Sequence, residues 1–232
     1  MNISNFNLNF NSRSSNRKNS VAFKSKKIYD LEILKLGKNG QYELVPASFT
    51  RLLNSSVEDC KALDSIKKSW KGADFITELV EKFNFTKNPY AHYAVEIKDD
   101  KLPLHKKIVA LACTSSSEVS NNSQLKLYLL QGKPASKYGQ DKRQFKGAGE
   151  LMMYGLTRIA KASNVEKLCL DSTNDAFYDA LHMRKKITNV NRAADYLSPE
   201  EAKRVSSITS ERYFLPEDFQ SFIKQISDKY KL

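Results

Sequence analysis

The chain has 232 residues and a formal net charge of +12, with 41% hydrophobic and 28% charged residues. This composition is ordinary for a soluble globular protein and excludes a collagen-like, low-complexity or wholly disordered chain. The longest apolar run, residues 108–113, is far short of the roughly 20 residues that a membrane-spanning helix needs, so we expect no membrane segment.

The N-terminal residues 1–27 are rich in Asn and Ser and carry six basic residues and no acid. A segment this polar buries too little apolar surface to offset the entropy cost of ordering it. We therefore predict a disordered basic tail at 1–27 and a single domain at 28–232. The tail composition is compatible with a solubilising extension, a leader for secretion or organelle targeting, or a nucleic-acid arm.

The cysteines and histidines are scattered along the chain. Cys60, Cys113 and Cys169 are widely spaced, and the last two lie in apolar, strand-like runs. This pattern indicates free thiols in a reducing compartment rather than a disulfide framework. No metal-ligand spacing occurs among the Cys and His residues. We expect a cytoplasmic protein without a metal site, unless the tail directs it to another compartment.

The first part of the domain predicts one strand and two helices. Residues 29–36 alternate apolar and polar side chains, as in a half-buried strand, and 38–40 supply a turn. Apolar residues at helical spacing over 47–70 predict a helix that breaks near 54–56. Residues 75–83 predict a second helix with Asp74 as its N-cap.

Three strand-like segments follow, and the polar connectors between them predict an antiparallel meander. These segments are 93–98, 108–113 and 125–129. After a glycine-containing loop, the pattern predicts a helix at 150–162, a strand at 165–171 and a helix at 175–184 that Ser172 or Asn174 caps. The C-terminal part predicts a helix from Ser198, a strand at 212–215 and a helix from Pro216. This order predicts a mixed α/β (α+β) domain.

The segment 143–150 is the most informative for function, because a glycine-containing loop leads directly into a helix. Such a loop presents unpaired backbone N–H groups at the positive end of the helix dipole, where diphosphates bind. Lys142, Arg143 and Lys146 add positive charge. A tight loop without a ligand is the alternative interpretation. Neither the GxGxxG dinucleotide fingerprint after a strand nor a Walker A loop is present.

The loop Gln144-Phe145-Lys146-Gly147-Ala148-Gly149 resembles the acetyl-CoA loop Q/R-x-x-G-x-G/A of the GCN5-related N-acetyltransferase (GNAT) superfamily. The later segment Phe177–Met183 resembles the family pattern F/L-Y-x-x-x-G-F, with His182-Met183 in place of Gly-Phe. The resemblance covers about residues 28–185 and leaves a divergent C-terminal part, 186–232. It implies a mostly antiparallel sheet flanked by helices, with the acetyl-CoA site between the fourth and fifth strands.

The resemblance also implies roles for individual residues, with acetyl-CoA as cosubstrate. Backbone groups of the fourth strand would bind the pantetheine arm, near Asn174: these are on Leu127, Tyr128, Leu129 and Leu130. The amides of the loop would hold the pyrophosphate, beside the charge of Arg143: these belong to Gln144, Phe145, Lys146, Gly147, Ala148 and Gly149. Tyr178 would lie beside the thioester sulfur and act as general acid.

The general base and the acceptor stay open at this level. Glu96 and Glu118 are the candidate bases, and a water-mediated base or a divergent site is the alternative, because the fourth strand contains no Glu. The acceptor amine belongs to a protein, a small molecule or an aminoacyl-tRNA. The competing functions are a catalytically inactive relative, a nucleic-acid- or protein-binding module that uses the tail, and a secreted effector acetyltransferase.

Overall fold

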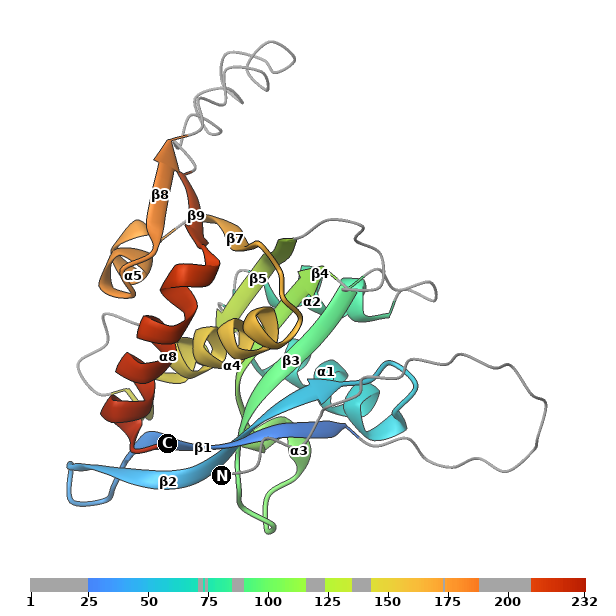
Figure 1. Ribbon diagram of the computed structural model, residues 1–232. Helices are drawn as coiled ribbons and strands as arrows, with labels where there is room; N and C mark the ends of the chain where they lie inside the picture. Colours follow the sequence, from blue (N-terminus) through green and yellow to red (C-terminus); the bar gives the residue numbers. More distant parts are fainter. Residues whose placement is uncertain are drawn as a thin grey trace, which may run out of the picture.

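The computed structural model describes residues 25–70, 73, 75–84, 90–115, 124–134, 143–172, 174–187 and 210–232. The described strands form one nine-stranded sheet in the order β6-β1-β2-β3-β4-β5-β7-β9-β8. Helices lie on both faces of this sheet (Figure 1). Seven of the strand pairs are antiparallel, and β5 with β7 is parallel. The predicted fold class, a mostly antiparallel mixed sheet flanked by helices, is confirmed.

The strands are β1 (Lys26–Leu36), β2 (Tyr42–Leu52), β3 (Tyr90–Ile97), β4 (Ile108–Ser115), β5 (Gln124–Gly132), β6 (Phe145–Lys146), β7 (Lys167–Ser172), β8 (Arg184–Ile187) and β9 (Ser210–Phe214). The helices are α1 (Val57–Ser69), α2 (Ile76–Phe83), α3 (Leu104–Lys107), α4 (Ala148–Ala162), α5 (Asp175–Ala180) and α8 (Pro216–Tyr230). The predicted meander is confirmed by β3, β4 and β5, which pair in sequence order.

The helix predicted over 47–70 is wrong in its first part, where residues 42–52 form strand β2. This strand lies between β1 and β3, and both of its faces are covered: Phe49 packs on the α4 side and Leu52 on the α1–α2 side. A strand covered on both faces loses its polar–apolar alternation, so its pattern is hard to tell from that of a buried helix. Helix α1 begins only after the N-cap Ser56.

Three predicted boundaries also differ from the structure. Strand β1 starts at Lys26, so the last two residues of the predicted tail belong to the sheet. Helix α2 has Phe75 at its N-cap position. The helix predicted over 175–184 ends at Ala180, because His182 takes a left-handed conformation (φ 57°) and β8 begins at Arg184. Residues 1–24, Asp74, Glu118, Lys142 and the helix predicted from Ser198 lie outside the described residues.

Two apolar clusters cover the two faces of the sheet. The α4 face carries the larger one, in which residues of α4, α5 and α8 pack on strands β1 to β7 and β9. The α1–α2 face carries the smaller one, built from α1 and α2 on β2, β3, β4 and β5. Helix α4 lies so close to β2 that a Cβ added at Gly155 would be 2.5 Å from the Phe49 ring. The sheet therefore separates two environments, and both reach strand β5.

Candidate active site

The sheet loses its regular pairing in the middle of β5. Leu127 lies opposite Thr114 of β4 and Leu129 opposite Cys113, so Tyr128 is an extra residue, a β-bulge. The parallel ladder with β7 ends at the same point, with Leu127 opposite Leu170, although β5 continues to Gly132. A bulge bends its strand and interrupts pairing. The backbone edge of residues 128–130 therefore faces no described strand, and we call this place the β5–β7 break.

The bulge also changes which face the side chains occupy. Because side chains alternate along a strand, one extra residue moves Leu129 to the α1–α2 cluster while Leu127 stays in the α4 cluster. Tyr128 is 43% exposed and meets Tyr90 edge to face at 5.4 Å. The Lys82 ammonium lies 4.7 Å from the centre of the Tyr90 ring. The β5–β7 break is thus bordered by apolar side chains on both faces and by two tyrosines on the α1–α2 face.

The glycine loop is held by the hairpin formed by β1 and β2. Its first residues form β6, which pairs with β1, and the Leu36 amide donates to the Gln144 carbonyl at 2.9 Å. The Tyr42 hydroxyl donates to the Arg143 carbonyl at 2.7 Å. The Lys146 ammonium lies 3.8 Å from the centre of the Tyr42 ring, a cation–π contact. These contacts hold the loop against the β1–β2 hairpin. They fix the backbone of Arg143 and the side chain of Lys146 at this place.

The N-terminus of α4 has the features of an anion site. Gly147 is its N-cap with φ 83°, a left-handed conformation that favours glycine, and no described side chain caps the first turn. The first amides of a helix lack intrahelical acceptors and lie at the positive end of its dipole. Glu150, in the first turn, accepts hydrogen bonds from two residues of α8: from the Lys229 ammonium at 2.6 Å and from the Tyr230 hydroxyl at 2.9 Å.

Both glycines of the loop are in close contact with other helices. A Cβ added at Gly147 would lie 1.8 Å from the Tyr230 hydroxyl of α8, and one at Gly149 would lie 3.0 Å from the Phe177 ring of α5. Side chains at these positions would therefore separate α8 and α5 from α4. This packing is one physical reason for the glycines, and the expected approach of a pyrophosphate to the same backbone stays a prediction.

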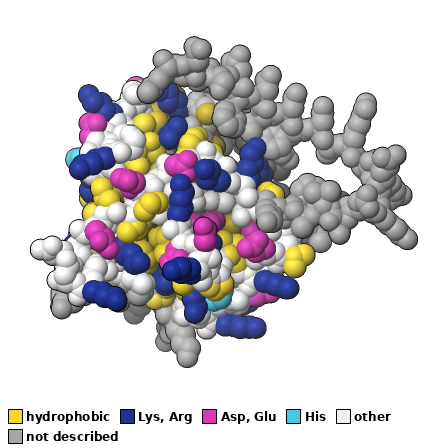
Figure 2. All heavy atoms as spheres, turned by 90° about the horizontal axis from the view of Figure 1, so that it is seen from below, with side chains coloured by type: hydrophobic (Ala, Val, Ile, Leu, Met, Phe, Trp, Pro, Cys, Tyr) yellow, Lys and Arg dark blue, Asp and Glu magenta, His cyan; other side chains and the backbone are white. Residues whose placement is uncertain are grey.

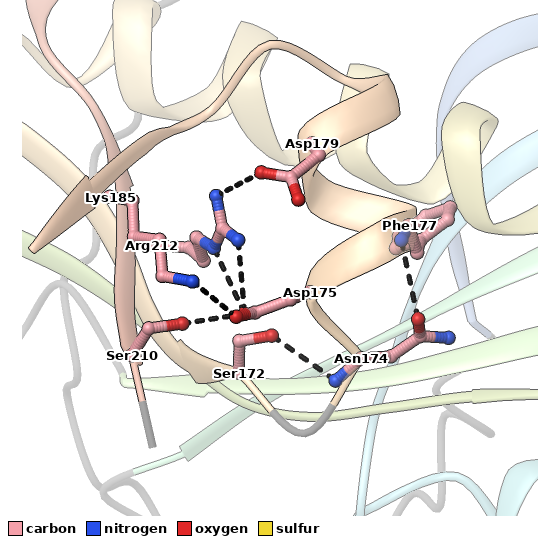
Figure 3. A network of polar contacts seen from close by, with 8 residues as sticks. All are labelled: Ser172, Asn174, Asp175, Phe177, Asp179, Lys185, Ser210 and Arg212. Atoms are coloured by element: carbon pink, nitrogen blue, oxygen red, sulfur yellow. Dashed lines mark hydrogen bonds and ion pairs between the residues drawn. The ribbon is translucent and has the colours of Figure 1, made fainter. Parts of the chain in front are cut away.

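Tyr178 lies on α5, the short helix after β7. Of the two caps that the sequence allowed, Ser172 and Asn174, it is Asn174 that caps this helix, by accepting from the Phe177 backbone amide at 3.2 Å (Figure 3). The backbone amide of Asn174 donates to the Ser172 hydroxyl at 3.1 Å. The Tyr178 side chain is 7% exposed, and its ring meets Phe177 at 4.9 Å. Burial raises the pKa of Tyr178 to about 12, so its hydroxyl keeps its proton at neutral pH.

Glu96 lies on the α1–α2 face of β3, opposite Ser48 and Ile108. Burial raises the pKa of Glu96 to about 7, against a hydrogen bond from Thr50, and its Oε1 has no partner among the described residues. On β4, Ile108 lies opposite Glu96 and Cys113 lies opposite Leu129, and these two β4 residues are five positions apart. At about 3.3 Å per residue, Glu96 is therefore roughly 16 Å from the β5–β7 break along the strand direction. At about 4.8 Å per strand, it is also about 10 Å away across the sheet. The structure does not bring this carboxyl to the break.

His92 was not among the site residues predicted from the sequence, in which the histidines are too scattered to suggest a metal site. It lies opposite Cys113, which in turn lies opposite Leu129, so it is in line with the β5–β7 break. The imidazole is 2% exposed, meets the Phe83 ring at 5.1 Å, and has no described partner for Nε2. Burial lowers the pKa of His92 to about 4, so it is neutral at pH 7. The alternation of side chains along β3 puts His92 and Glu96 on one face, and this was the signal in the sequence that could have singled out His92.

The described part of the chain contains neither a metal-binding group of side chains nor a membrane-spanning helix. Within the described ranges, no three His, Cys, Asp or Glu side chains come together in a group that could hold a metal ion. None of the described helices combines the length and the apolar character needed to cross a membrane. Cys113 and Cys169 are buried free cysteines on β4 and β7.

Comparisons with known proteins give similarity at the level of structure. No protein-family model matches the chain, and no curated protein matches it in sequence. A structure from Desulfovibrio desulfuricans assigned to the GNAT acetyltransferase family is 13% identical, with a TM-score of 0.48 over 73% of this chain and 99% of that one. The PaiA N-acetyltransferase of Thermoplasma acidophilum, solved with coenzyme A, is 11% identical, with a TM-score of 0.45 over 73% and 98%.

The ribosomal-protein-S18-alanine N-acetyltransferase of Escherichia coli is 14% identical, with a TM-score of 0.43 over 72% of this chain and 90% of that one. All three identities are low and all three TM-scores are below 0.5. The chain's own element order has the GNAT-like arrangement that its two motifs imply, with the glycine loop between β5 and α4 and Tyr178 on the helix after β7.

Proposed function

We propose that the chain is an acetyl-CoA-dependent N-acetyltransferase that transfers the acetyl group to an amine by direct attack. The observation that carries this proposal is the β5–β7 break. Beyond the bulge at Tyr128, the edge of β5 pairs with no strand among the described residues, and such an edge can hydrogen-bond an extended amide-containing chain as a further strand would. The pantetheine arm of coenzyme A is such a chain.

In this proposal the cofactor follows the open edge towards the glycine loop. Backbone groups of Tyr128, Leu129 and Leu130 bind the pantetheine, whereas Leu127 is the last residue engaged by β7. The pyrophosphate is bound by the uncapped amides of residues 147–149, which a helix N-terminus presents to anions. Asn174 uses its Oδ1 as a helix cap and keeps its side-chain NH₂ available for the pantetheine.

The reaction forms one bond and breaks one. The amine nitrogen attacks the thioester carbonyl carbon, the C–N bond forms, the C–S bond breaks, and the sulfur leaves as a thiolate. The Tyr178 hydroxyl, which is protonated at neutral pH, donates a hydrogen bond to the sulfur as charge develops and passes its proton to the thiolate. The amine loses one proton to the general base, and the Tyr178 phenolate regains one from solvent, so the step balances. The enzyme otherwise contributes proximity and orientation.

Glu96 is the candidate general base to be tested first, and it acts only through a chain of waters, because its carboxyl does not lie at the break. A pKa of about 7 suits a base at neutral pH. Its distance from the break requires a relay, and His92, in line with the break, is the competing group. The pH profile of kcat/KM separates them. Under this assignment, the apparent pKa near 7 disappears in Glu96→Gln and persists in His92→Gln.

The acceptor is an amine of a protein, a small molecule or an aminoacyl-tRNA. On the face seen in Figure 2, basic and acidic side chains are interspersed rather than separated by sign. A binding module that depends on the basic tail predicts salt-sensitive nucleic-acid binding that disappears when residues 1–24 are removed. We expect the same deletion to leave coenzyme A binding unchanged.

The test begins with coenzyme A itself. Isothermal titration of the full chain with coenzyme A and acetyl-CoA is expected to show binding, and thiol release from acetyl-CoA is expected with a member of an amine panel. Replacing Arg143 or Lys146 by Ser should lower the affinity roughly tenfold in each case, because one lost charge-assisted contact costs about 1.5 kcal/mol. Lys67→Ser, on α1, is the control. No binding of either ligand contradicts the proposal.

A further inference from the structure

A buried arginine joins the end of the sheet to the helix that carries Tyr178 (Figure 3). Arg212 lies on β9, opposite Leu170 of β7 and Lys185 of β8, and its side chain is 1% exposed. Its Nη1 donates to Asp179 Oδ1 at 2.6 Å and its Nε to Asp175 Oδ1 at 3.1 Å. Its Nη2 lies 3.1 Å from the same Asp175 oxygen. One guanidinium therefore holds both carboxylates.

The first residue of α5 is tied to the sheet by two more donors. The Ser210 hydroxyl of β9 donates to Asp175 Oδ1 at 2.5 Å, and the Lys185 ammonium of β8 donates to Asp175 Oδ2 at 2.7 Å. Figure 3 shows these side chains converging on the start of the helix. The contacts come from two strands that follow α5 in the chain, so they link α5 to the C-terminal edge of the sheet.

Helix α5 has six residues, and it is otherwise held by apolar contacts: Tyr178 is its buried residue, and Phe177 packs against α4 at Gly149. A helix this short has no stability of its own in water. Asp175 and Asp179 are four residues apart, so they project from one side of the helix, one turn from each other. Contacts at both ends of α5 define its tilt and its rotation about its own axis.

We propose that Arg212 is a positioning residue for acetyl transfer: by holding Asp175 and Asp179 together, its guanidinium sets the place of the Tyr178 hydroxyl. This inference rests on the proposed function, because it assigns Tyr178 to the reaction. Tyr178 is adjacent to Asp179 and three residues after Asp175, so a rotation of α5 moves its hydroxyl directly. A misplacement of about 1 Å at a reacting group costs about 10²-fold in rate.

Arginine suits this role better than lysine. Its planar guanidinium presents several N–H donors in a fixed fork, so it can bridge two carboxylates at once and define their relative position. The compact ammonium of a lysine keeps the charge and reaches one carboxylate at a time. Arg212→Lys therefore removes the bridge while it preserves the buried positive charge.

The neighbouring strand supplies a matched control. Arg184 of β8 also holds two carboxylates, with Nη2 2.9 Å from Glu217 and Nε 2.8 Å from Asp218. Its side chain is 41% exposed, and its partners begin α8 rather than α5. Arg184→Lys thus breaks the same kind of bridge without affecting the helix that carries Tyr178.

The kinetic arm of the test is a double-mutant cycle in the full chain. We expect Arg212→Lys to lower kcat for acetyl transfer by 10- to 100-fold with little change in the KM for acetyl-CoA, and Arg184→Lys to leave both unchanged. In a Tyr178→Phe background, the effect of Arg212→Lys on kcat should vanish, because the two residues act through one hydroxyl. An effect of the same size in both backgrounds overturns the proposal.

A spectroscopic arm needs no turnover, so it distinguishes failure of this inference from failure of the proposed function. With 3-fluorotyrosine at position 178, the ¹⁹F resonance and its pH titration report the surroundings of the ring. Arg212→Lys should shift the resonance and lower the titration midpoint, since a freed α5 exposes the hydroxyl. Asp179→Asn, an isosteric change at an exposed partner, should do the same if Arg212→Lys does not fold.

The two arms separate the positioning role from the enzyme activity. A resonance that is unchanged in both folded variants overturns the positioning role, whatever the enzyme activity. Absence of coenzyme A binding in the unsubstituted chain overturns the proposed function, and the ¹⁹F arm still decides whether Arg212 sets the place of Tyr178. Shifts in Arg212→Lys and Asp179→Asn but not in Arg184→Lys support the inference.

Discussion

The two faces of the sheet differ in what they bury. On the α4 face, helices α4, α5 and α8 pack apolar side chains on strands β1 to β7 and β9, and Tyr178 is part of this cluster. On the α1–α2 face, the apolar cluster is smaller, and this side of the molecule holds several buried or half-buried titratable groups. Among them are Asp59, His92 and Glu96. Both faces meet at the bulge of β5, where Leu127 and Leu129 point to opposite sides.

In the proposed acetyl transfer, the two faces would have different roles. The α4 face holds the elements proposed to bind the cofactor, whose positions depend on close packing and on the Arg212 contacts. The α1–α2 face holds groups whose pKa values burial has shifted towards or away from neutrality, which is what proton transfer requires. Changes on the two faces should therefore differ in kind: geometry on the α4 face, and pH dependence on the α1–α2 face.

The largest effect is expected from Tyr178→Phe, which removes one oxygen from the α4 face. Loss of a general acid costs about 10²- to 10⁴-fold in rate, so kcat should fall within this range while the KM for acetyl-CoA stays nearly unchanged. Steady-state kinetics with acetyl-CoA measure both. Tyr213→Phe, on β9, is the control and should retain activity. A decrease of less than tenfold contradicts the assignment of Tyr178.

On the α1–α2 face, Glu96→Gln should change the pH dependence of stability. The folded-state pKa of Glu96 is raised to about 7, so the folded state prefers the protonated acid. Its contribution is fully present below about pH 4 and is lost as the pH rises towards 7. At pH 8 the substitution should raise the free energy of unfolding by about 3 kcal/mol, since one pKa unit is worth about 1.4 kcal/mol.

Urea unfolding at pH 5 and pH 8 measures this difference. Glu81→Gln, at an exposed position of α2, should leave the pH dependence unaltered. If Glu96→Gln had the same effect on stability at both pH values, the carboxyl would not titrate in the folded state as its burial requires.

The packing of the α4 face is tested by Gly155→Ala. The new Cβ would lie 2.5 Å from the Phe49 ring of β2, so the helix or the ring must move. Overpacking of this kind costs about 1–3 kcal/mol, more than the roughly 0.5–1 kcal/mol that alanine gains over glycine in a helix. Thermal or urea unfolding should show the loss. Phe49→Leu in the same chain should recover part of it by making room.

The smallest effect is expected from Asp175→Asn at acid pH. Hydrogen bonds from Lys185, Ser210 and Arg212 hold the pKa of Asp175 well below its usual range. Its contribution to stability is present above the ordinary pKa near 3.8 and is lost as the pH falls through the lowered value. The Asp175 side chain is 38% exposed, so solvent screening keeps the effect small.

Comparison of unfolding at pH 5 and pH 3 checks this prediction: the unsubstituted chain should lose more stability than Asp175→Asn. The sign is opposite to that of Glu96, which loses its contribution as the pH rises. An equal loss in both chains would show that the Asp175 contacts do not depend on its charge, and it would remove this contrast between the two faces.

The amino-acid sequence by itself determined the elements that local pattern controls. Alternation and apolar runs predicted β3, β4 and β5 as a meander, and Asn174 was one of two residues predicted to cap the helix after β7. The glycine loop, α4 and the helix with Tyr178 were predicted from turn residues and helical spacing. Each of these signals lies within one segment of the chain, so each can be seen without knowing what the segment contacts.

Only the tertiary structure decided the features that depend on contacts between distant segments. Strand β2 took its conformation from β1 and β3, which cover its edges while helices cover both of its faces. The bulge at Tyr128 is seen only in the register of β5 with β4. The separation of Glu96 from the break is seen only in the registers of β3 and β5 with the strand β4 between them. Arg212 meets Asp175 and Asp179 because β9 lies beside β7. Hydrogen bonds and ion pairs of this kind join residues more than thirty positions apart, so the hydrophobic periodicity within one segment does not predict them.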